Sequence, residues 1–197
     1  LDMQTHGAVM LRTERKPALV NHFAYQEYRF VRGALGMAAE PVRGDAFRGV
    51  RTTYSDEAIA QASSFARAAG AQAGAPVIMY NPDSASKYNL MPFPSQAALL
   101  ERLARDTSDG TVILLGEGHT AAGIGVHLRD ALPPPLQAKV RLIPKSMSVE
   151  AFGALIDAAD VFVTGDTGPL HLAASRKYSR TGHFPFRNQT AILSFFG

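Results

Sequence analysis

The sequence contains no cysteine among its 197 residues, which excludes disulfide bonds, thiol nucleophiles and metal sites built on cysteine. It also has no run of the roughly 18 apolar residues that a membrane-spanning helix needs. The histidines lack the spacing of metal ligands, so we predict no metal site; they stand at positions 6, 22, 119, 127, 171 and 183. These absences favour a cytoplasmic protein.

Charge and composition restrict the partners only loosely. The formal net charge is +3, which mildly favours anionic partners such as phosphates, lipid headgroups or nucleic acid. The basic residues are scattered along the chain, however, so a solvated basic surface is the simpler interpretation and no nucleic-acid partner is expected. Hydrophobic residues make up 46% of the chain, which is enough to bury a core.

Strand and helix signals alternate regularly from residue 77 onward. Apolar runs predict five strands, at residues 76–81, 111–116, 139–144, 161–165 and 190–197. Helical patterns separate them, at residues 95–107, 121–132, 149–160 and 169–177. In the first helix Ala98, Leu99 and Leu103 are expected on the apolar face. Strands without polar alternation indicate burial on both faces, so we predict an α/β fold with a doubly wound parallel sheet.

The first 70 residues are less regular. An aromatic-rich helix is predicted at residues 23–37, and a second helix at 55–70, with Ser55 as its N-cap. The Ala/Gly-rich residues 71–76 are expected to be a linker between residues 1–70 and a domain that spans residues 77–197.

In open α/β sheets, ligands bind beyond the carboxyl ends of the strands, so the turns after the strands are the candidate sites. The turn after the first strand, "NPDSASKYN" (81–89), combines Ser84, Ser86 and Lys87. Small hydroxylated residues beside a lysine suit the binding of phosphate. An ordinary serine-rich turn with an exposed lysine is the alternative interpretation.

The turn after the second strand, "GEGHTA" (116–121), matches the dinucleotide-binding pattern G-x-G-x-x-G/A between a strand and a helix. Glu117, His119 and Thr120 lie within it. The next strand ends in Pro144 and Lys145, without an acidic residue that could bind a ribose. A close approach to a nucleotide is therefore plausible, whereas specificity for NAD is not supported.

The turn after the fourth strand, "GDTGPLHLAAS" (165–175), resembles an anion site at a helix N-terminus. Gly165 and Gly168 would allow a sharp turn and a close approach to a ligand, and Pro169 suits the start of a helix. The amides from Thr167 to Leu170, together with His171, could donate to an anion. Asp166 would repel that anion unless it caps amides or binds a hydroxyl. A capped helix with a packed histidine explains the residues equally well.

Taken together, these segments resemble glycosyltransferase family 9, the ADP-heptose:lipopolysaccharide heptosyltransferases. "ADVFVTGDTGPLHLAAS" is similar to the family's signature, in which Asp-x-Gly-Pro-x-His-Leu-Ala follows a strand. "VIMYNPDSASKYN", "TVILLGEGHT", "IPKSMSVEAFGALIDAADVFVTGDTG" and "TAILSFFG" resemble other family segments in the same order. The resemblance covers residues 76–197 well and the earlier residues, including "LDMQTHG", more loosely.

The resemblance implies a GT-B fold with two Rossmann-like domains, of which residues 1–70 would belong to the acceptor-side domain. It implies an inverting, metal-independent enzyme without a cofactor, which transfers heptose from ADP-heptose to a lipopolysaccharide core or another acceptor. Such an enzyme could associate peripherally with the inner face of the cytoplasmic membrane.

The residues that match the family's motifs acquire expected roles. Asp166, Thr167, Gly168, Pro169 and His171 would surround the diphosphate and the sugar. Lys87, with Ser84 and Ser86, would neutralise phosphate charge. Glu117, His119 or Thr120 would lie near the nucleoside, and Met147 would pack on the base.

Some features depart from the family pattern. The family's acidic catalytic base is expected to precede Leu1, and its last helices to follow Gly197. Residues 176–189 form a longer link than is usual and could contact the acceptor. Another GT-B enzyme, such as a UDP-sugar transferase or a 2-epimerase, and a non-catalytic nucleotide-binding module remain alternatives.

Overall fold

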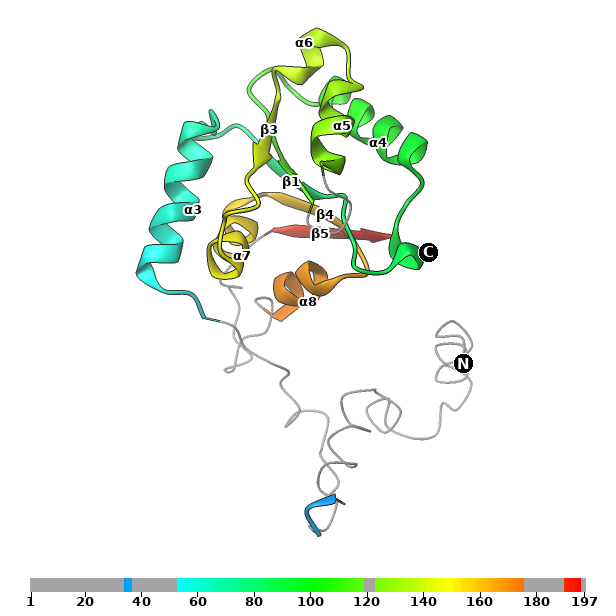
Figure 1. Cartoon of the computed structure of the whole chain (residues 1–197). Helices are drawn as coiled ribbons and strands as arrows, with labels where there is room; N and C mark the ends of the chain where they lie inside the picture. The colour runs from blue at the N-terminus through cyan, green and yellow to red at the C-terminus, as the bar shows by residue number, and fades with distance from the viewer. Residues whose placement is uncertain (1–33, 37–52, 119–122, 176–189, 196–197) are drawn as a thin grey trace, which may run out of the picture. The chain divides into compact units, whose positions relative to one another are not determined.

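Five parallel strands form the centre of the described part of the chain (Figure 1). The computed structural model describes residues 34–36, 53–118, 123–175 and 190–195. By its contacts the chain divides into two units, Leu1–Gly49 and Val50–Gly197, which are treated separately. The predicted helix at 23–37 lies almost wholly outside the described residues. In the second unit the helix α3 (Asp56–Ala68) groups with the sheet. The predicted domain division at 71–76 stays a prediction.

The strand order is β3-β2-β1-β4-β5, and every neighbouring pair is parallel. The strands are β1 (Val77–Asn81), β2 (Val112–Gly116), β3 (Val140–Ile143), β4 (Val161–Gly165) and β5 (Ala191–Phe195). The first strand lies between β2 and β4, so the chain winds outward from it in both directions. This arrangement confirms the predicted doubly wound sheet, and all five predicted strands are present.

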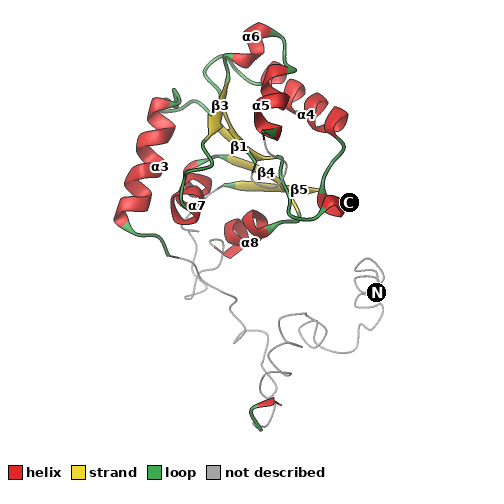
Figure 2. Ribbon diagram, in the orientation of Figure 1, coloured by secondary structure: helices red, strands yellow, loops and turns green. Residues whose placement is uncertain are grey.

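Helices cover both faces of the sheet, as Figure 2 shows. Every residue of β1 and β2 is buried, which explains why their sequences are apolar without alternation. One face packs against α3 (Asp56–Ala68), α7 (Val149–Ala158) and α8 (Gly168–Ser175). The other face packs against α4 (Phe93–Asp106), α5 (Ile124–Asp130) and the short α6 (Pro134–Gln137).

Serine residues are the N-caps of two of the helices. The Ser55 hydroxyl accepts a hydrogen bond from the Ala58 amide at 3.2 Å, which confirms the predicted cap of α3. Ser148 caps α7 in the same way, at 3.1 Å from the Ala151 nitrogen. The helix α6, with prolines in its first turn, was not predicted.

The buried face of α4 matches the prediction in part. Leu99 and Leu103 are partly buried against the core, as predicted, whereas Ala98 is exposed. The fully buried positions are Gln96, Leu100 and Ala104, spaced four residues apart. The polar Gln96 can be buried because its amide nitrogen donates to the Met91 carbonyl oxygen at 2.7 Å. Burial also raises the pKa of the neighbouring Tyr80 well above the usual range of a phenol.

Among the described helices, none is both long and apolar enough to cross a membrane.

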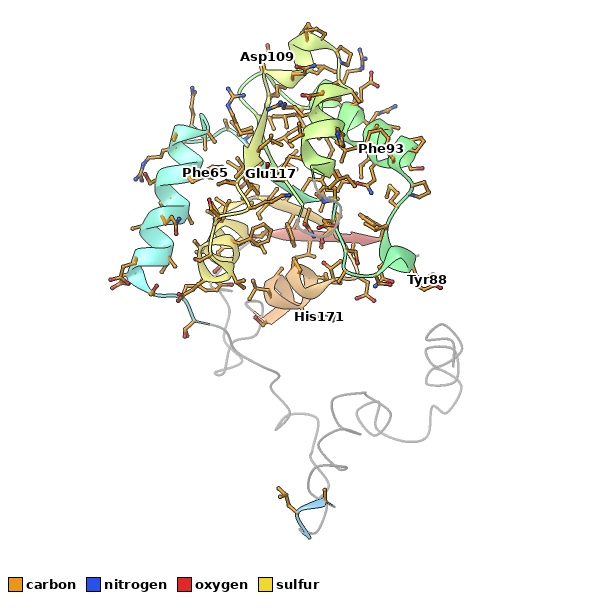
Figure 3. The ribbon with its side chains drawn as sticks, in the orientation of Figure 1. Phe65, Tyr88, Phe93, Asp109, Glu117 and His171 are labelled. Carbon is orange, nitrogen blue, oxygen red and sulfur yellow. The ribbon has the colours of Figure 1, made fainter. Side chains whose placement is uncertain are left out.

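Two aromatic side chains, Tyr88 of the 3-10 helix η2 (Lys87–Asn89) and Phe93 of α4, point outward instead of into the core (Figure 3).

The sheet core should dominate the stability of this unit. Leu114 in β2 is completely buried, so Leu114→Ala is expected to lower the free energy of unfolding by about 2–5 kcal/mol. Leu193→Ala in β5 is the matched control, because its side chain is 56% exposed and should contribute less than ~0.5 kcal/mol. Urea denaturation measures both values. Equal losses would contradict the assignment of the core.

Candidate functional site: a pocket at the carboxyl edge of the sheet

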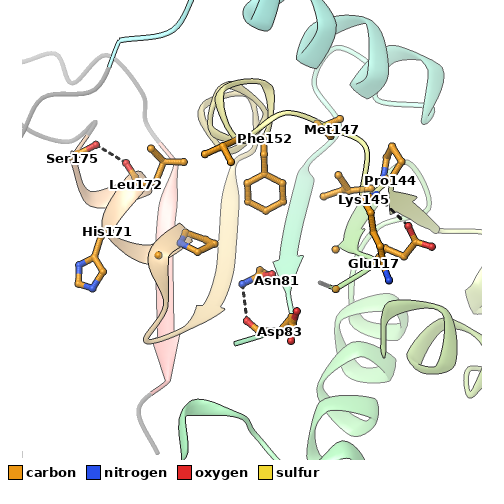
Figure 4. Close-up of a pocket in the computed structure, with 16 residues that line it drawn as sticks. Asn81, Asp83, Glu117, Pro144, Lys145, Met147, Phe152, His171, Leu172 and Ser175 are labelled. Atoms are coloured by element: carbon orange, nitrogen blue, oxygen red, sulfur yellow. Dashed lines mark hydrogen bonds between the residues drawn. The ribbon is translucent and has the colours of Figure 1, made fainter. Parts of the chain in front are cut away.

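A pocket of about 650 Å³ lies at the carboxyl ends of the strands, where ligands of open α/β sheets bind. Its walls come from the turns after β1, β2 and β3, from the start of α7 and from α8. Figure 4 places His171 on one side of it and Glu117 with Lys145 on the other, with the Phe152 ring between them.

One wall of the pocket is apolar. Met147, Val149 and Phe152, in the β3–α7 turn and the first turn of α7, line it together with Ile143 and Pro144. Val149 is 78% exposed, although it is a large aliphatic residue. Because Ser148 caps α7 directly after this turn, Val149 and Phe152 are held by a capped helix, and Met147 directly precedes the cap. A flat apolar ring of a ligand would fit such a wall.

Glu117 connects the β2 turn to this wall. Its carboxylate accepts a hydrogen bond from the Lys145 amide at 3.2 Å, which ties the turn after β2 to the turn after β3. Both residues line the pocket. The carboxylate has further acceptor capacity, so it could also bind a hydroxyl group of a ligand.

Glycines allow the β2 turn to run close to α5. Gly118 has a φ of +88°, which a residue with a side chain rarely adopts. A Cβ on Gly125 would lie 2.2 Å from the Gly116 carbonyl oxygen, so α5 packs directly on the strand end. Gly125, which lies beyond the dinucleotide pattern, therefore makes a close helix–strand contact of the kind that the third glycine of such a pattern makes.

The turn after β1 is held by its own side chains. The Ser84 hydroxyl accepts from the Ser86 amide at 3.2 Å, and the Ser86 hydroxyl accepts from the Tyr88 amide at 3.3 Å. Neither serine lines the pocket, so both shape the turn that presents Lys87. Two neighbours that were not predicted, Asn81 and Asp83, do line it.

The turn after β4 leads into α8, and its residues are partly exposed. The Leu170 and His171 amides both donate to the Thr167 carbonyl oxygen, at 3.0 and 3.4 Å. Pro169 has no amide hydrogen and is the second residue of the helix. Among the described residues, the amides of Thr167 and Gly168 are therefore the donors that an anion could use here, fewer than the sequence suggested.

Asp166 lies beside His171, with 3.7 Å between its carboxylate and the His171 Nε2 atom. His171 is 76% exposed and lines the pocket, whereas the Asp166 carboxylate does not. A protonated His171 would offset the negative charge of Asp166. Gly165 makes a close internal contact, because a Cβ there would lie 2.9 Å from the Asn89 carbonyl oxygen, and its predicted role in approaching a ligand stays a prediction.

The structure thus brings together part of the predicted set. Glu117, Met147, Gly168, Pro169 and His171 all line the pocket. Ser84, Ser86, Asp166 and Thr167 lie in the adjoining turns without lining it. His119 and Thr120 lie outside the described residues, as does the Lys87 side chain.

Sequence reasoning missed several lining residues, namely Asn81, Asp83, Lys145, Val149, Phe152, Leu172 and Ser175. Asn81 and Asp83 could have been found, because they directly follow the first strand. Phe152 and Leu172 could not, since an apolar residue in a helix usually indicates core packing. Among the described residues, no three His, Asp or Glu side chains gather in a group that could hold a metal ion.

The fold and the pocket together define a Rossmann-like α/β domain of the GT-B type. The model of glycosyltransferase family 9 (heptosyltransferase) matches residues 38–179, so the chain belongs to this family. No curated protein matches the chain significantly.

Two solved structures share this fold. The first is the E. coli ADP-heptose lps heptosyltransferase II, with 19% identity and a TM-score of 0.54. The match covers 73% of this chain and 44% of that one. The second is a family 9 glycosyltransferase from Veillonella parvula, with 17% identity and a TM-score of 0.59; the match covers 85% of this chain and 48% of that one. The part that this chain matches is therefore less than half of either structure.

The contact between Gly125 and Gly116 should be sensitive to one methyl group. Gly125→Ala is expected to lower the free energy of unfolding by about 1–3 kcal/mol, because the backbone of β2 must move away. Gly168→Ala is the control, since no atom lies within 4 Å of a Cβ at that position. Thermal or chemical denaturation compares the two variants. A tolerated Gly125→Ala would contradict the packing described for this turn.

Proposed function

We propose that this chain carries the donor site of a glycosyltransferase that transfers heptose from ADP-heptose to an acceptor hydroxyl. One observation supports it most: a single pocket combines an apolar wall suited to a ring with a helix N-terminus suited to an anion. Membership of family 9 supports a glycosyltransferase. The E. coli structure with the same fold is named for ADP-heptose, which supports the choice of donor.

The nucleoside would lie on the apolar wall. Met147, Val149 and Phe152 would pack against the adenine ring, whose burial is favoured by the hydrophobic effect. Glu117 would accept a hydrogen bond from a ribose hydroxyl while its other interaction holds the Lys145 amide. His119 and Thr120 follow in the same turn and are proposed as further neighbours of the nucleoside.

The diphosphate would lie at the start of α8. The Thr167 and Gly168 amides, the helix dipole, His171 and Lys87 would together neutralise its charge. Ser84 and Ser86 would act indirectly, by shaping the turn that carries Lys87. These groups would stabilise the departing ADP most strongly as its negative charge develops, which lowers the barrier to transfer.

The reaction itself would be a single displacement. The acceptor oxygen would attack the anomeric carbon and invert it, while the bond from that carbon to the diphosphate oxygen breaks and its electron pair leaves with ADP. A base would take the proton of the acceptor hydroxyl. We propose that no metal is needed, because the cationic and amide groups named above carry the charge of the leaving group.

Two features of the acceptor side are part of the proposal. The acceptor would be a lipopolysaccharide core or another glycan, and the enzyme would work at the cytoplasmic surface of a membrane. Asp166 would orient His171 or bind a sugar hydroxyl, in keeping with its distance of 3.7 Å from the imidazole.

Ligand binding should show a preference for ADP. ADP is expected to raise the melting temperature of the chain in a concentration-dependent manner, with weaker effects of UDP and NAD. Stabilisation by NAD alone would contradict the proposal, and a preference for UDP would favour a UDP-sugar enzyme. Release of ADP from ADP-heptose in the presence of an acceptor then separates a transferase from a binding module.

The side chains of His171 and Lys87 should affect affinity without affecting the fold. His171→Ala is expected to weaken ADP binding about fivefold, or ~1 kcal/mol, because the exposed imidazole is partly screened by water. Lys87→Ala is expected to weaken it at least as much. His127→Ala in α5 is the matched control, since this exposed histidine does not line the pocket. Calorimetry measures the affinities. Unchanged values in both site variants would refute the assignment.

A further inference from the structure

Asn89 links the two turns that flank the proposed diphosphate site. It is the last residue of η2, in the connection that follows β1. Its side-chain amide nitrogen donates a hydrogen bond of 2.7 Å to the carbonyl oxygen of Asp166, in the turn before α8. The two residues are 77 positions apart in the sequence, so this bond joins two separate loops of the carboxyl edge.

The backbone of Asn89 strengthens the same contact. Its carbonyl oxygen lies so close to Gly165 that a Cβ there would approach it to 2.9 Å. Asn89 therefore touches two consecutive residues of the β4–α8 turn, one through its side chain and one through its main chain. Its own amide donates to the Ser86 carbonyl oxygen at 3.0 Å, which connects this contact to the turn that carries Lys87.

We propose that Asn89 is a positioning residue for the diphosphate site, an inference that rests on the proposed function. Asn89 is not one of the residues that line the pocket, so it acts through others. By holding the Asp166 carbonyl, it sets the direction of the next two amides, those of Thr167 and Gly168. Asn89 also sets the distance between the turn after β1, which carries Lys87, and the start of α8.

This role affects only one end of the pocket. The apolar wall is formed by the β3–α7 turn and the start of α7. The Ser148 cap and the hydrogen bond between Glu117 and the Lys145 amide hold this segment in place. Neither interaction involves Asn89. Loss of the Asn89 side-chain amide should therefore weaken the binding of the phosphates and leave the binding of the nucleoside unchanged.

The experiment replaces the amide by an apolar group of similar size. Asn89→Leu removes the donor without adding charge, and Asn89→Ser, too short to reach the carbonyl, is measured alongside in case leucine prevents folding. Gln137→Met is the matched control, because the Gln137 side chain also donates to a backbone carbonyl, that of Leu132 at 2.8 Å, away from the pocket.

Two measurements are made on each variant of the full chain. Hydrogen exchange of the Leu170 and His171 amides, which donate to the Thr167 carbonyl, reports whether the turn is held. Calorimetry with pyrophosphate, ADP and adenosine reports which part of the site depends on it. We expect faster exchange and about tenfold weaker binding of pyrophosphate and ADP in the Asn89 variants, with adenosine unchanged. Gln137→Met should change neither.

The outcomes separate this inference from the proposed function. Unchanged exchange, or adenosine binding weakened as much as ADP binding, overturns the positioning role while the proposed function stands. Faster exchange with normal pyrophosphate binding overturns it as well. A wild-type chain that binds no ADP overturns the proposed function instead, and the exchange rates then decide whether Asn89 holds the turn.

Discussion

The junction between β1 and β4 is the constraint on which the site depends. At the carboxyl end of these strands, the Asn81 side-chain nitrogen donates to the Thr164 hydroxyl at 3.1 Å, and Thr164 in turn lies 3.4 Å from the Thr167 hydroxyl. After β1 the chain crosses to the face covered by α4, and after β4 it crosses to the face covered by α8. The two connections therefore leave the sheet edge toward opposite faces, and the space between them forms part of the pocket.

Apolar packing and polar hydrogen bonds shape different parts of this pocket. The packed strands and helices fix where the turns begin, because the central residues of the sheet are fully buried. Within the turns, single hydrogen bonds then hold the backbone: Glu117 binds the Lys145 amide, and Asn89 binds the Asp166 carbonyl. The result is one cavity with chemically different ends, which would suit the apolar base and the charged diphosphate of the proposed donor.

The sequence predicted the architecture well because buried parallel strands carry a strong signal. Val112 to Leu115 must be apolar on both faces, and Ser55 marks a helix start by a local hydrogen bond. The site was predicted only in part. Glu117 in a recognisable turn and His171 in the first turn of α8 do line the pocket. Phe152 also lines it, from a helix in which an apolar residue normally indicates core packing.

What the sequence determined by itself was the order and type of the elements and the turns in which polar and glycine residues gather, since these follow from local pattern and burial. Only the tertiary structure decided which glycine serves which contact. Gly125 packs on the Gly116 carbonyl, and Gly165 accommodates the Asn89 backbone. Both contacts join segments that are separated along the chain. Their geometry depends on the packing of whole elements, and no local pattern encodes it.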